Sequence, residues 1–317
     1  DSTRLAEIGD EGVLAMVGDS TNAMVEGRTK SESKAEAGLK AAIAAAEGRV
    51  AVTCFSSNVA RIQSIIKAAQ ANDRSVAIVG RAIKRAMSAA QEVGYLCNLP
   101  DFVAEEDIEL LPRENIVIIC TGTQGEPRAA MAKIAAGTHE SVTLDLGDTV
   151  IYSSRQIPGN EPAIARVQDA LIRRKINLIT DEDAPVHVSG HPSRDEMIEM
   201  YGLVRPQIAI PVHGTARHLM AHAALAQGCQ VGQTLIPDNG NVIKLADSSG
   251  QDAAEASIID NVKTGALTHE KGQIIEVQSD MMRARRRMLW NGAVTASVVL
   301  NRDGALCAVP TVSQTGI

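Results

Sequence analysis

The sequence predicts a layered α/β protein whose sheets are mainly parallel. Short apolar runs alternate with helix-like segments from the start of the chain to about residue 226. Turn-forming residues separate these segments, which is typical of successive βαβ units. Beyond residue 226 the pattern changes to alternating strands joined by turns that contain asparagine and glycine. We therefore expect an α/β body followed by a smaller region rich in hairpins.

The composition indicates a globular protein. The 317 residues are enough for a sizeable core in one large or two intermingled domains. Only 2% of the residues are aromatic, so aliphatic side chains must fill that core. The five widely spaced cysteines form no CxxC pair, which argues against a cysteine zinc site and predicts a reducing cytoplasm. No apolar run reaches the length of a membrane span, and the first residues do not resemble a signal peptide.

The protein has a net charge of −7 at pH 7, so its charge as a whole does not attract nucleic acid. Phosphate contacts depend on local patches, however, and the densest basic patch is Arg283–Arg287. The ordinary interpretation of this patch is a solvated helix face. The alternative is a surface that faces RNA or a protein partner.

Runs rich in Val, Ile and Leu that are bounded by turn residues predict the strands. These strands are Val13–Val17, Arg49–Phe55, Ser75–Gly80, Asn115–Cys120, Asp148–Ser154, Asn177–Thr180, Ala184–Val188 and Gln207–Val212. Later in the chain, Asn301–Gly304 predicts a hairpin turn between strands Val294–Leu300 and Ala305–Val309, and Asn239–Asn241 predicts another. The tail Ser313–Ile317 shows no obvious element.

Helices are expected where alanine-rich or amphipathic segments follow capping residues. Residues 1–12 are helix-like, and a helix over Lys30–Glu47 begins near Ser31 or Ser33. Pro192 opens a helix that extends to Leu203, with acids in its first turn as the helix dipole favours. The remaining helices end near Ala71, Val93, Ala136 and Arg174, and a last one carries His218 and His222.

Polar residues follow several of the predicted strands and are candidates for binding. Asp19 follows the first strand, where a turn or cap is the simpler explanation. Ser57, Asn58 and Arg61 lie where the next strand gives way to a helix. A helix start offers free N–H groups to a phosphate and a nearby arginine adds charge, although ordinary capping explains the Ser and Asn equally well.

The turn Thr121–Pro127 is rich in glycine and connects a strand to a helix. It contains Thr123, Gly125 and Glu126, but it matches neither the P-loop nor the GxGxxG pattern. It is therefore a weak indication of phosphate binding. Together with similar turns, it leaves open a nucleotide-binding α/β protein.

Two histidines occupy matched positions at strand ends. One predicted strand leads into Ser189-Gly190-His191 and the next into His213-Gly214. The carboxyl ends of neighbouring parallel strands face one crevice, so both histidines can point at one ligand. The alternative is that each is a hydrogen-bonded core or loop histidine. We interpret His218 and His222, one turn apart on the following helix, as surface or packing residues.

Six blocks in this order resemble ribonuclease J, a nuclease family with a metallo-β-lactamase fold and a β-CASP insertion. They are GDSTNA, TCFSSNVARIQ, TGTQGEPRAA, DTVIYSSRQIPGNE, HVSGHPSRDEM and IPVHGTARHL, and they cover nearly the whole chain. The resemblance implies a partial metallo-β-lactamase αββα domain, formed by residues 1–28 and 189–317 with the start of a C-terminal linker. It also implies that a β-CASP α/β domain with a mainly parallel sheet, residues 29–188, interrupts it.

The resemblance assigns roles to three residues. Asp19, His191 and His213 match the family's motifs A, B and C. His213 would ligate one of two metal ions, usually zinc, with manganese or magnesium as alternatives. Asp19 would hold and polarise His191, which would protonate the departing 3′ oxygen. Hydrolysis of a phosphodiester at neutral pH needs such an acid and a metal, so His191 would be charged and His213 neutral.

The resemblance also implies a substrate and partners. RNA would lie in the cleft between the domains, with His187, Ser189 and Gly190 around a terminal or scissile phosphate. Single-stranded RNA with a 5′-monophosphate is expected, because a narrow cleft excludes a duplex. The activity would be 5′→3′ exonucleolytic and endonucleolytic, in messenger-RNA decay and ribosomal-RNA maturation. A homo-oligomer and partners in an RNA-degradation complex are expected for the full-length protein.

One departure from the family pattern is large. The HxHxDH motif, a further histidine and an aspartate in a TGDF-like turn supply most of the family's metal ligands. None is present before the DSTN block, and the first histidine of the chain is His139. We therefore expect a partial ribonuclease J that is inactive or nearly so by itself. The alternative is a non-catalytic RNA-binding or scaffold subunit that has lost its metal half.

Overall fold

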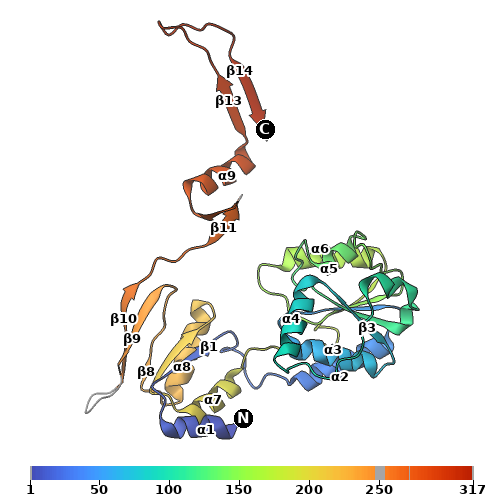
Figure 1. The fold of residues 1–317 in the computed structure, drawn as a ribbon. Coiled ribbons are helices and arrows are strands. Elements are labelled where there is room, and N and C mark those ends of the chain that lie inside the picture. The colour runs from blue at the N-terminus through green and yellow to red at the C-terminus, as the bar shows by residue number, and fades with distance from the viewer. Residues whose placement is uncertain (1, 247–253, 271, 316–317) are drawn as a thin grey trace.

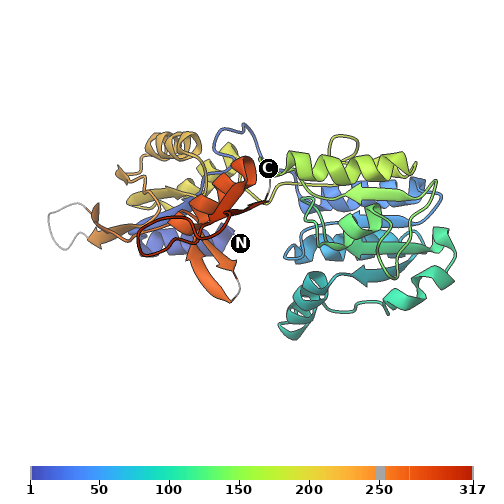
Figure 2. The same ribbon diagram turned by 90° about the horizontal axis from the view of Figure 1, so that it is seen from above.

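The computed structural model describes residues 2–246, 254–270 and 272–315. These residues form two lobes and an extended C-terminal arm (Figure 1). Viewed from above, the lobes lie side by side, and the chain passes between them along two connecting segments (Figure 2). In these described ranges, no helix combines the length and the apolar character that crossing a bilayer requires.

The smaller lobe is built on a three-stranded sheet with the order β1-β7-β8, in which both pairings are parallel. These strands are β1 (Ala15–Asp19), β7 (Ile208–Val212) and β8 (Gln233–Thr234). Three helices belong to this lobe, α1 (Ser2–Glu11), α7 (Arg194–Val204) and α8 (Ala216–Gly228). The antiparallel pair β9 (Asn241–Ala246) and β10 (Glu255–Asn261) packs apolar residues against β7. The sheet therefore has apolar residues packed on both faces, which suits a parallel sheet.

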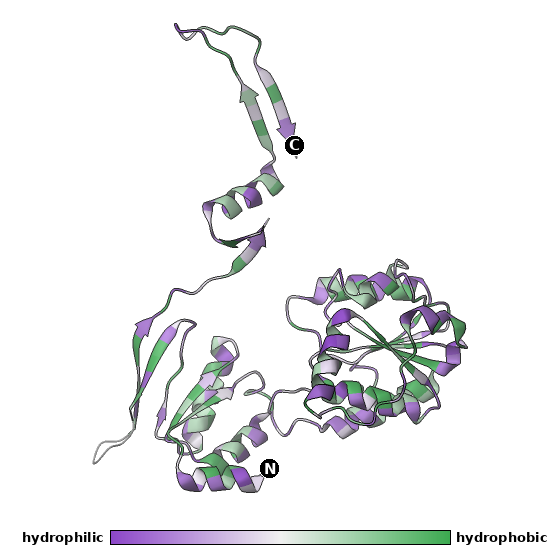
Figure 3. Ribbon diagram, in the orientation of Figure 1, coloured by the Kyte–Doolittle hydropathy of each residue, from purple (hydrophilic) through white to green (hydrophobic). Residues whose placement is uncertain are grey.

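The larger lobe holds a five-stranded parallel sheet with the order β3-β4-β2-β5-β6. Its strands are β2 (Val50–Thr53), β3 (Ser75–Val79), β4 (Ile116–Cys120), β5 (Thr149–Tyr152) and β6 (Asn177–Ile179). The helices are α2 (Glu32–Ala45), α3 (Val59–Gln70), α4 (Arg81–Glu92), α5 (Ala130–Ala135) and α6 (Glu161–Arg173), with 3₁₀ turns η1 (Glu105–Leu110) and η2 (Arg113–Asn115). Helices α2, α3 and α4 cover one face and α5 and α6 the other, so the strands are mostly apolar (Figure 3).

The predicted alternation of strands and helices is confirmed over most of the chain, with ends that agree or differ by one or two residues. The predicted strand Ala184–Val188 is wrong, because these residues pair with none of the strands that the structure describes. They form an extended segment that leaves the larger lobe and enters the smaller one. Pro185 cannot donate a ladder hydrogen bond. The carbonyl of Val186 instead accepts hydrogen bonds from the side chains of Arg61 and Ser153.

The arm consists of the antiparallel pair β11 (Leu267–Glu270) and β12 (Gln273–Glu276), helix α9 (Asp280–Asn291), and the pair β13 (Ala293–Ser297) and β14 (Thr311–Thr315). The predicted turn Asn301–Gly304 is present and the predicted strand Val294–Leu300 overlaps β13, but the predicted strand Ala305–Val309 is wrong. The partner of β13 is β14, in the tail that we expected to lack an element, and Ala305–Val309 contributes only a Leu300–Leu306 bridge.

The turn before β9 also differs from expectation. Asn239 and Gly240 do form a turn, but the antiparallel partner of β9 follows it in the chain rather than preceding it. Part of the loop between β9 and β10, residues 247–253, lies outside the described residues. The basic residues Arg283–Arg287 lie on α9, where their side chains are exposed. This position agrees with the interpretation as a solvated helix face.

Candidate functional site

The structure brings Asp19, His191 and His213 together although they are far apart in the sequence. Asp19 ends β1 and His213 follows β7, and these two strands are parallel neighbours with Asp19 opposite Val212. His191 comes from the turn before α7. Oδ2 of Asp19 lies 2.7 Å from Nδ1 of His191 and 3.0 Å from Nδ1 of His213. One carboxylate oxygen therefore accepts hydrogen bonds from two imidazoles.

The two imidazole rings are also held against each other. The rings of His191 and His213 are stacked, with centroids 5.3 Å apart and planes inclined by 27°. His213 has φ of 57°, in the left-handed region that residues other than glycine seldom adopt. The hydroxyl of Thr21 donates to its carbonyl at 3.1 Å. Backbone strain of this kind concentrates at functional sites.

The hydrogen bonds decide which nitrogen of each imidazole ring carries a proton and which remains available to a ligand. An ionised carboxylate only accepts hydrogen bonds, so Nδ1 of both histidines must carry a proton. The lone pair of a neutral His213 is then on Nε2, as in metal-binding histidines held by a carboxylate. Burial acts to raise the pKa of Asp19, but hydrogen bonds from the Thr21 backbone N–H and from His191 hold this pKa below its ordinary value. The carboxylate is therefore ionised at neutral pH.

A buried histidine supports the turn that carries Asp19. His222 on α8 is 2% exposed, and its Nδ1 lies 2.9 Å from the hydroxyl of Ser20. Its Nε2 lies 2.8 Å from the hydroxyl of Tyr201 on α7. Burial lowers the pKa of His222, which keeps the ring neutral with one donor and one acceptor nitrogen. A Cβ on Gly18 would lie 2.9 Å from this ring, so glycine is needed there.

The packing role expected for His222 therefore includes a polar network that sequence reasoning missed. No local pattern could have revealed it, because Ser20 and His222 are separated by 202 positions. His218 has a different place. Its Nδ1 accepts a hydrogen bond from the backbone N–H of Thr215 and so caps the start of α8.

The turn that carries His191 is fixed by side chains from the first connecting segment and its flanks. The amide of Asn22 donates to Ser189 Oγ at 3.1 Å and to the carbonyl of His191 at 3.0 Å. The hydroxyl of Thr29 donates to the same carbonyl at 2.8 Å. A capping box between Ser193 and Glu196 then begins α7. Asn22 and Thr29 are thus site residues that the sequence patterns did not single out as binding groups.

Arg61 does not occupy the position expected for a phosphate ligand. It is 0% exposed, and its guanidinium binds both carboxylate oxygens of Glu32 on α2. Its Nη1 donates to Ser153 and, at 3.1 Å, to Nδ1 of His187. Because these partners occupy the guanidinium inside the protein, it cannot reach a phosphate in this conformation. Arg61 instead positions His187.

His187 is held neutral by this arrangement. Burial, followed by the charge of Arg61, lowers the pKa of His187 to about 4. Since Arg61 donates to Nδ1, the imidazole proton is on Nε2. The ring can therefore donate one hydrogen bond from Nε2 at neutral pH.

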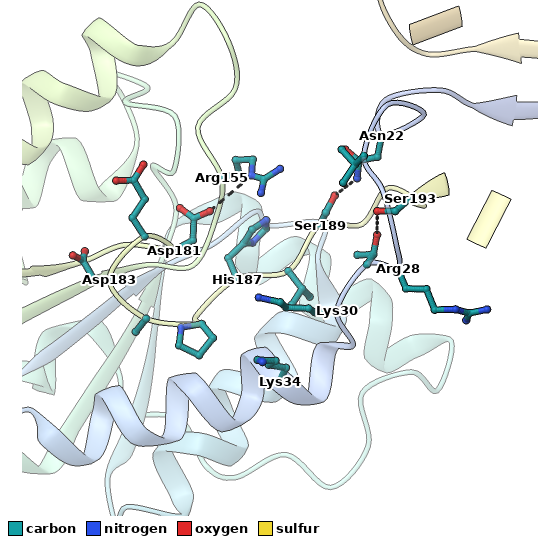
Figure 4. Close-up of a pocket in the computed structure, with 16 residues that line it drawn as sticks. Asn22, Arg28, Lys30, Lys34, Arg155, Asp181, Asp183, His187, Ser189 and Ser193 are labelled. Carbon is teal, nitrogen blue, oxygen red and sulfur yellow. Dashed lines mark hydrogen bonds and ion pairs between the residues drawn. The ribbon is translucent and has the colours of Figure 1, made fainter. Parts of the chain in front are cut away.

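His187 and Ser189 line a hollow of about 530 Å³, which we call the interlobe hollow. Figure 4 shows their side chains between Arg155, which comes from the end of β5, and Asn22 of the smaller lobe. The hollow is also lined by three further cations, Arg28, Lys30 and Lys34, and by acids that include Asp181, which lies 3.8 Å from Arg155. Gly190, next in the chain, is exposed. The hollow thus offers several donors to an anion.

The other expected phosphate ligands lie outside the interlobe hollow. Ser57 is exposed, and the Asn58 side chain accepts from the backbone N–H of Arg61, which is ordinary capping of α3. Thr123 is buried, and Glu126 accepts from a backbone N–H within its own turn. A Cβ on Gly125 would lie 2.4 Å from the backbone of Ala163 on α6. This glycine therefore permits close packing of its turn against α6.

Comparison with known proteins identifies the family. Residues 47–171 match a family model described as the β-CASP domain of ribonuclease J, and residues 184–233 match one described as a Zn-dependent metallo-hydrolase RNA specificity domain. The ribonuclease J of Sinorhizobium meliloti is 43% identical over 319 residues, which cover 100% of this chain. The chain belongs to the ribonuclease J family. The expected combination of a β-CASP domain with a metallo-hydrolase domain is thereby confirmed.

Other ribonucleases J are also similar to the chain over most of its length. That of Mycolicibacterium smegmatis is 41% identical over 96% of the chain, and that of a Synechocystis species is 37% identical over 100%. The chain spans about half the length of these curated relatives, 55%, 54% and 49% in the order given. A crystal structure of an Enterococcus faecalis V583 protein of unknown function has a similar fold, with TM-score 0.50, 12% identity and coverage of 81% of this chain and 54% of that one.

The described residues fit part of a zinc site of the kind this family model implies. Asp19, His191 and His213 each offer one ligand atom, and these atoms lie within 4.8 Å of one another. It is the one such cluster in the part of the chain that the structure describes. A catalytic zinc ion takes three protein ligands. Nε2 of His213 fits one of these positions, and ligands from elsewhere must complete the site.

Proposed function

We propose that this chain carries the RNA-binding and acid–base part of a metal-dependent ribonuclease that hydrolyses phosphodiester bonds of single-stranded RNA. One observation carries the proposal, namely that Asp19 holds His191 and His213 through a single oxygen at the ends of two parallel strands. Both 5′→3′ exonuclease and endonuclease activity, in messenger-RNA decay and ribosomal-RNA maturation, belong to the proposal. So do domain boundaries near residues 28 and 188, two zinc ions per complete site, and homo-oligomers of the full-length protein.

In the proposed mechanism, Nε2 of His213 holds one metal ion. A bound zinc ion supplies Lewis-acid chemistry, since it polarises phosphoryl oxygens and lowers the pKa of water. His191 in its charged form donates the Nε2 proton to the departing 3′ oxygen. The Asp19 carboxylate accepts the Nδ1–H of His191 at 2.7 Å, which orients the ring and favours the charge that it must carry before transfer.

The interlobe hollow is the proposed site of the 5′-monophosphate. Nε2–H of neutral His187, the hydroxyl of Ser189 and the backbone of Gly190 would donate to its oxygens, and Lys30 and Arg155 would balance its charge. His187 and His191 are four positions apart in one segment. The terminal phosphate and the proton donor would therefore belong to one continuous substrate path.

The test joins the chain to an upstream segment that carries HxHxDH and follows cleavage of a 5′-monophosphorylated single strand. Replacement His191→Ala should lower the cleavage rate by about 10²–10⁴-fold, the usual contribution of a general acid. The exposed His269, in the arm, provides the matched control His269→Ala, which should leave the rate unchanged. Elemental analysis should find about two zinc ions in the joined protein.

Two results would count against this function. Cleavage by the His191→Ala protein at the unsubstituted rate would remove His191 from the mechanism. Tight RNA binding by a joined, zinc-loaded protein that cleaves nothing would favour the alternative, a non-catalytic RNA-binding or scaffold subunit.

A further inference from the structure

A second hollow, of about 520 Å³, lies in the larger lobe at the carboxyl ends of β3 and β4. Its walls carry five basic side chains: Arg81, Lys84 and Arg85 at the start of α4, and Arg128 and Lys133 around the start of α5. We call it the basic hollow. It shares no lining residue with the interlobe hollow, and none of its residues takes part in the site around Asp19.

The charge of the basic hollow is opposite to that of the protein as a whole. Glu105 is the one acid among its lining residues, and it already binds Lys84 at 2.6 Å. Arg81, Arg85, Arg128 and Lys133 form no ion pair within 4.0 Å with any residue that the structure describes. In a chain of net charge −7, such a cluster produces a local positive potential that attracts anions.

The topology places the basic hollow on the same edge of the sheet as the interlobe hollow. All five strands are parallel, so their carboxyl ends share one edge. The order β3-β4-β2-β5-β6 puts the basic hollow at one end of that edge and the segment after β6, which leads to His187 and His191, at the other. Neighbouring strands are ~4.8 Å apart, so the two hollows are separated by roughly 15 Å along the edge.

We propose that the basic hollow is a second phosphate-binding subsite, which holds the backbone of the same single-stranded RNA several nucleotides away from the scissile bond. This inference rests on the proposed function. Arginine guanidinium groups suit phosphodiester oxygens because they bind them through two hydrogen bonds. No Phe, Tyr or Trp lines the basic hollow to stack on a base. The subsite therefore binds RNA without regard to sequence and favours long strands.

The test measures binding to RNAs of about two and about twenty nucleotides, both 5′-monophosphorylated, at several salt concentrations; the shorter RNA cannot reach from the interlobe hollow to the basic hollow. The triple variant Arg81→Gln, Arg85→Gln and Lys133→Gln removes charge from exposed positions and keeps good helix formers. It should weaken binding of the long RNA by about tenfold or more and leave the short RNA unaffected. The slope of log K against log salt should fall by about 0.7 for each lost phosphate contact.

A matched control removes the same charge elsewhere in the larger lobe. Arg166→Gln, Arg173→Gln and Lys175→Gln change exposed residues of α6 and of the turn before β6, and the last two lie at the opposite edge of the sheet. If the control weakens the long RNA as much as the test variant does, or if the test variant weakens both RNAs equally, the inference is wrong while the proposed nuclease stands. If the unsubstituted chain binds neither RNA, both proposals fail.

Discussion

Arg61 and Glu32 form a two-pronged ion pair beside the interlobe hollow, with Nε of Arg61 2.6 Å from one carboxylate oxygen and Nη2 2.9 Å from the other. The arginine is fully buried and the glutamate is partly exposed. The same guanidinium holds His187, so the ion pair joins the framework of the larger lobe to the proposed phosphate site. Its strength is therefore relevant both to folding and to binding.

Replacement Glu32→Gln should destabilise the protein by about 3 kcal/mol, because it leaves a buried guanidinium without its counter-charge. The measurement is the free energy of unfolding in urea. The exposed pair Lys67 and Glu36, 3.9 Å apart, provides the control. Glu36→Gln should cost less than about 1 kcal/mol. Equal costs for the two variants would show that burial of Arg61 contributes nothing.

The pKa of His187 predicts a dependence of stability on pH. In the unfolded chain this histidine takes a proton below its ordinary pKa of 6.5, but in the folded protein it does so only near pH 4. The stability that neutral His187 contributes is complete above pH 6.5 and is lost as the pH falls toward 4. Between pH 6.5 and pH 5 the loss should be about 1 kcal/mol after allowance for solvent screening. Unfolding of the His187→Gln variant should show a shallower pH dependence, and an identical one would contradict the assignment.

Loss of the Asp19 charge should affect both histidines at once. Asp19→Asn keeps the shape of the side chain but no longer offers an ionised oxygen to the two Nδ1–H groups. In the protein joined to an HxHxDH segment, zinc affinity should fall by about 10–100-fold. Cleavage should fall by at least about 10²-fold. The control is Asp169→Asn, which changes an exposed residue of α6. Unchanged zinc affinity in the Asp19→Asn protein would contradict the assignment of His213 as a zinc ligand.

The network beneath Asp19 should be worth more than its single hydrogen bonds. His222→Ala leaves two buried hydroxyls without a partner and opens a cavity, so it should cost about 3 kcal/mol. Tyr201→Phe removes one hydrogen bond and should cost about 1 kcal/mol. Unfolding in urea measures the free-energy cost of each substitution, provided that the dependence of the unfolding free energy on urea concentration is unchanged. A cost for His222→Ala no larger than that for Tyr201→Phe would mean that the ring contributes no packing.

The sequence predicted best what depends on local pattern. The parallel sheet of the larger lobe follows from apolar runs such as Ile116–Cys120 between helices, because a strand buried on both faces must be apolar throughout. The rule that parallel strands end at one edge explains the meeting of Asp19 and His213. His191 does not follow a strand, so its place beside them followed from the ordered family motifs alone. Both are statements about neighbours in a known topology.

What failed depends on contacts between distant parts of the chain. Val186 lies in an apolar run that looks like a strand, but its carbonyl accepts hydrogen bonds from Arg61 on α3 and from Ser153 just after β5, and Pro185 cannot complete a ladder. Arg61 occupies a position that suits a phosphate ligand, but Glu32 lies across the helix pair and binds it first. Glu32 is 29 positions away from Arg61, so the sequence around Arg61 does not indicate this ion pair.

The segment between the lobes sets a limit on how far they can move apart at the site. His187 is fastened to Arg61 of the larger lobe and His191 to Asp19 of the smaller one, with three residues between them. Four peptide steps extend at most about 14 Å. Any hinge motion that accompanies RNA entry must therefore keep the two histidines within this distance of each other.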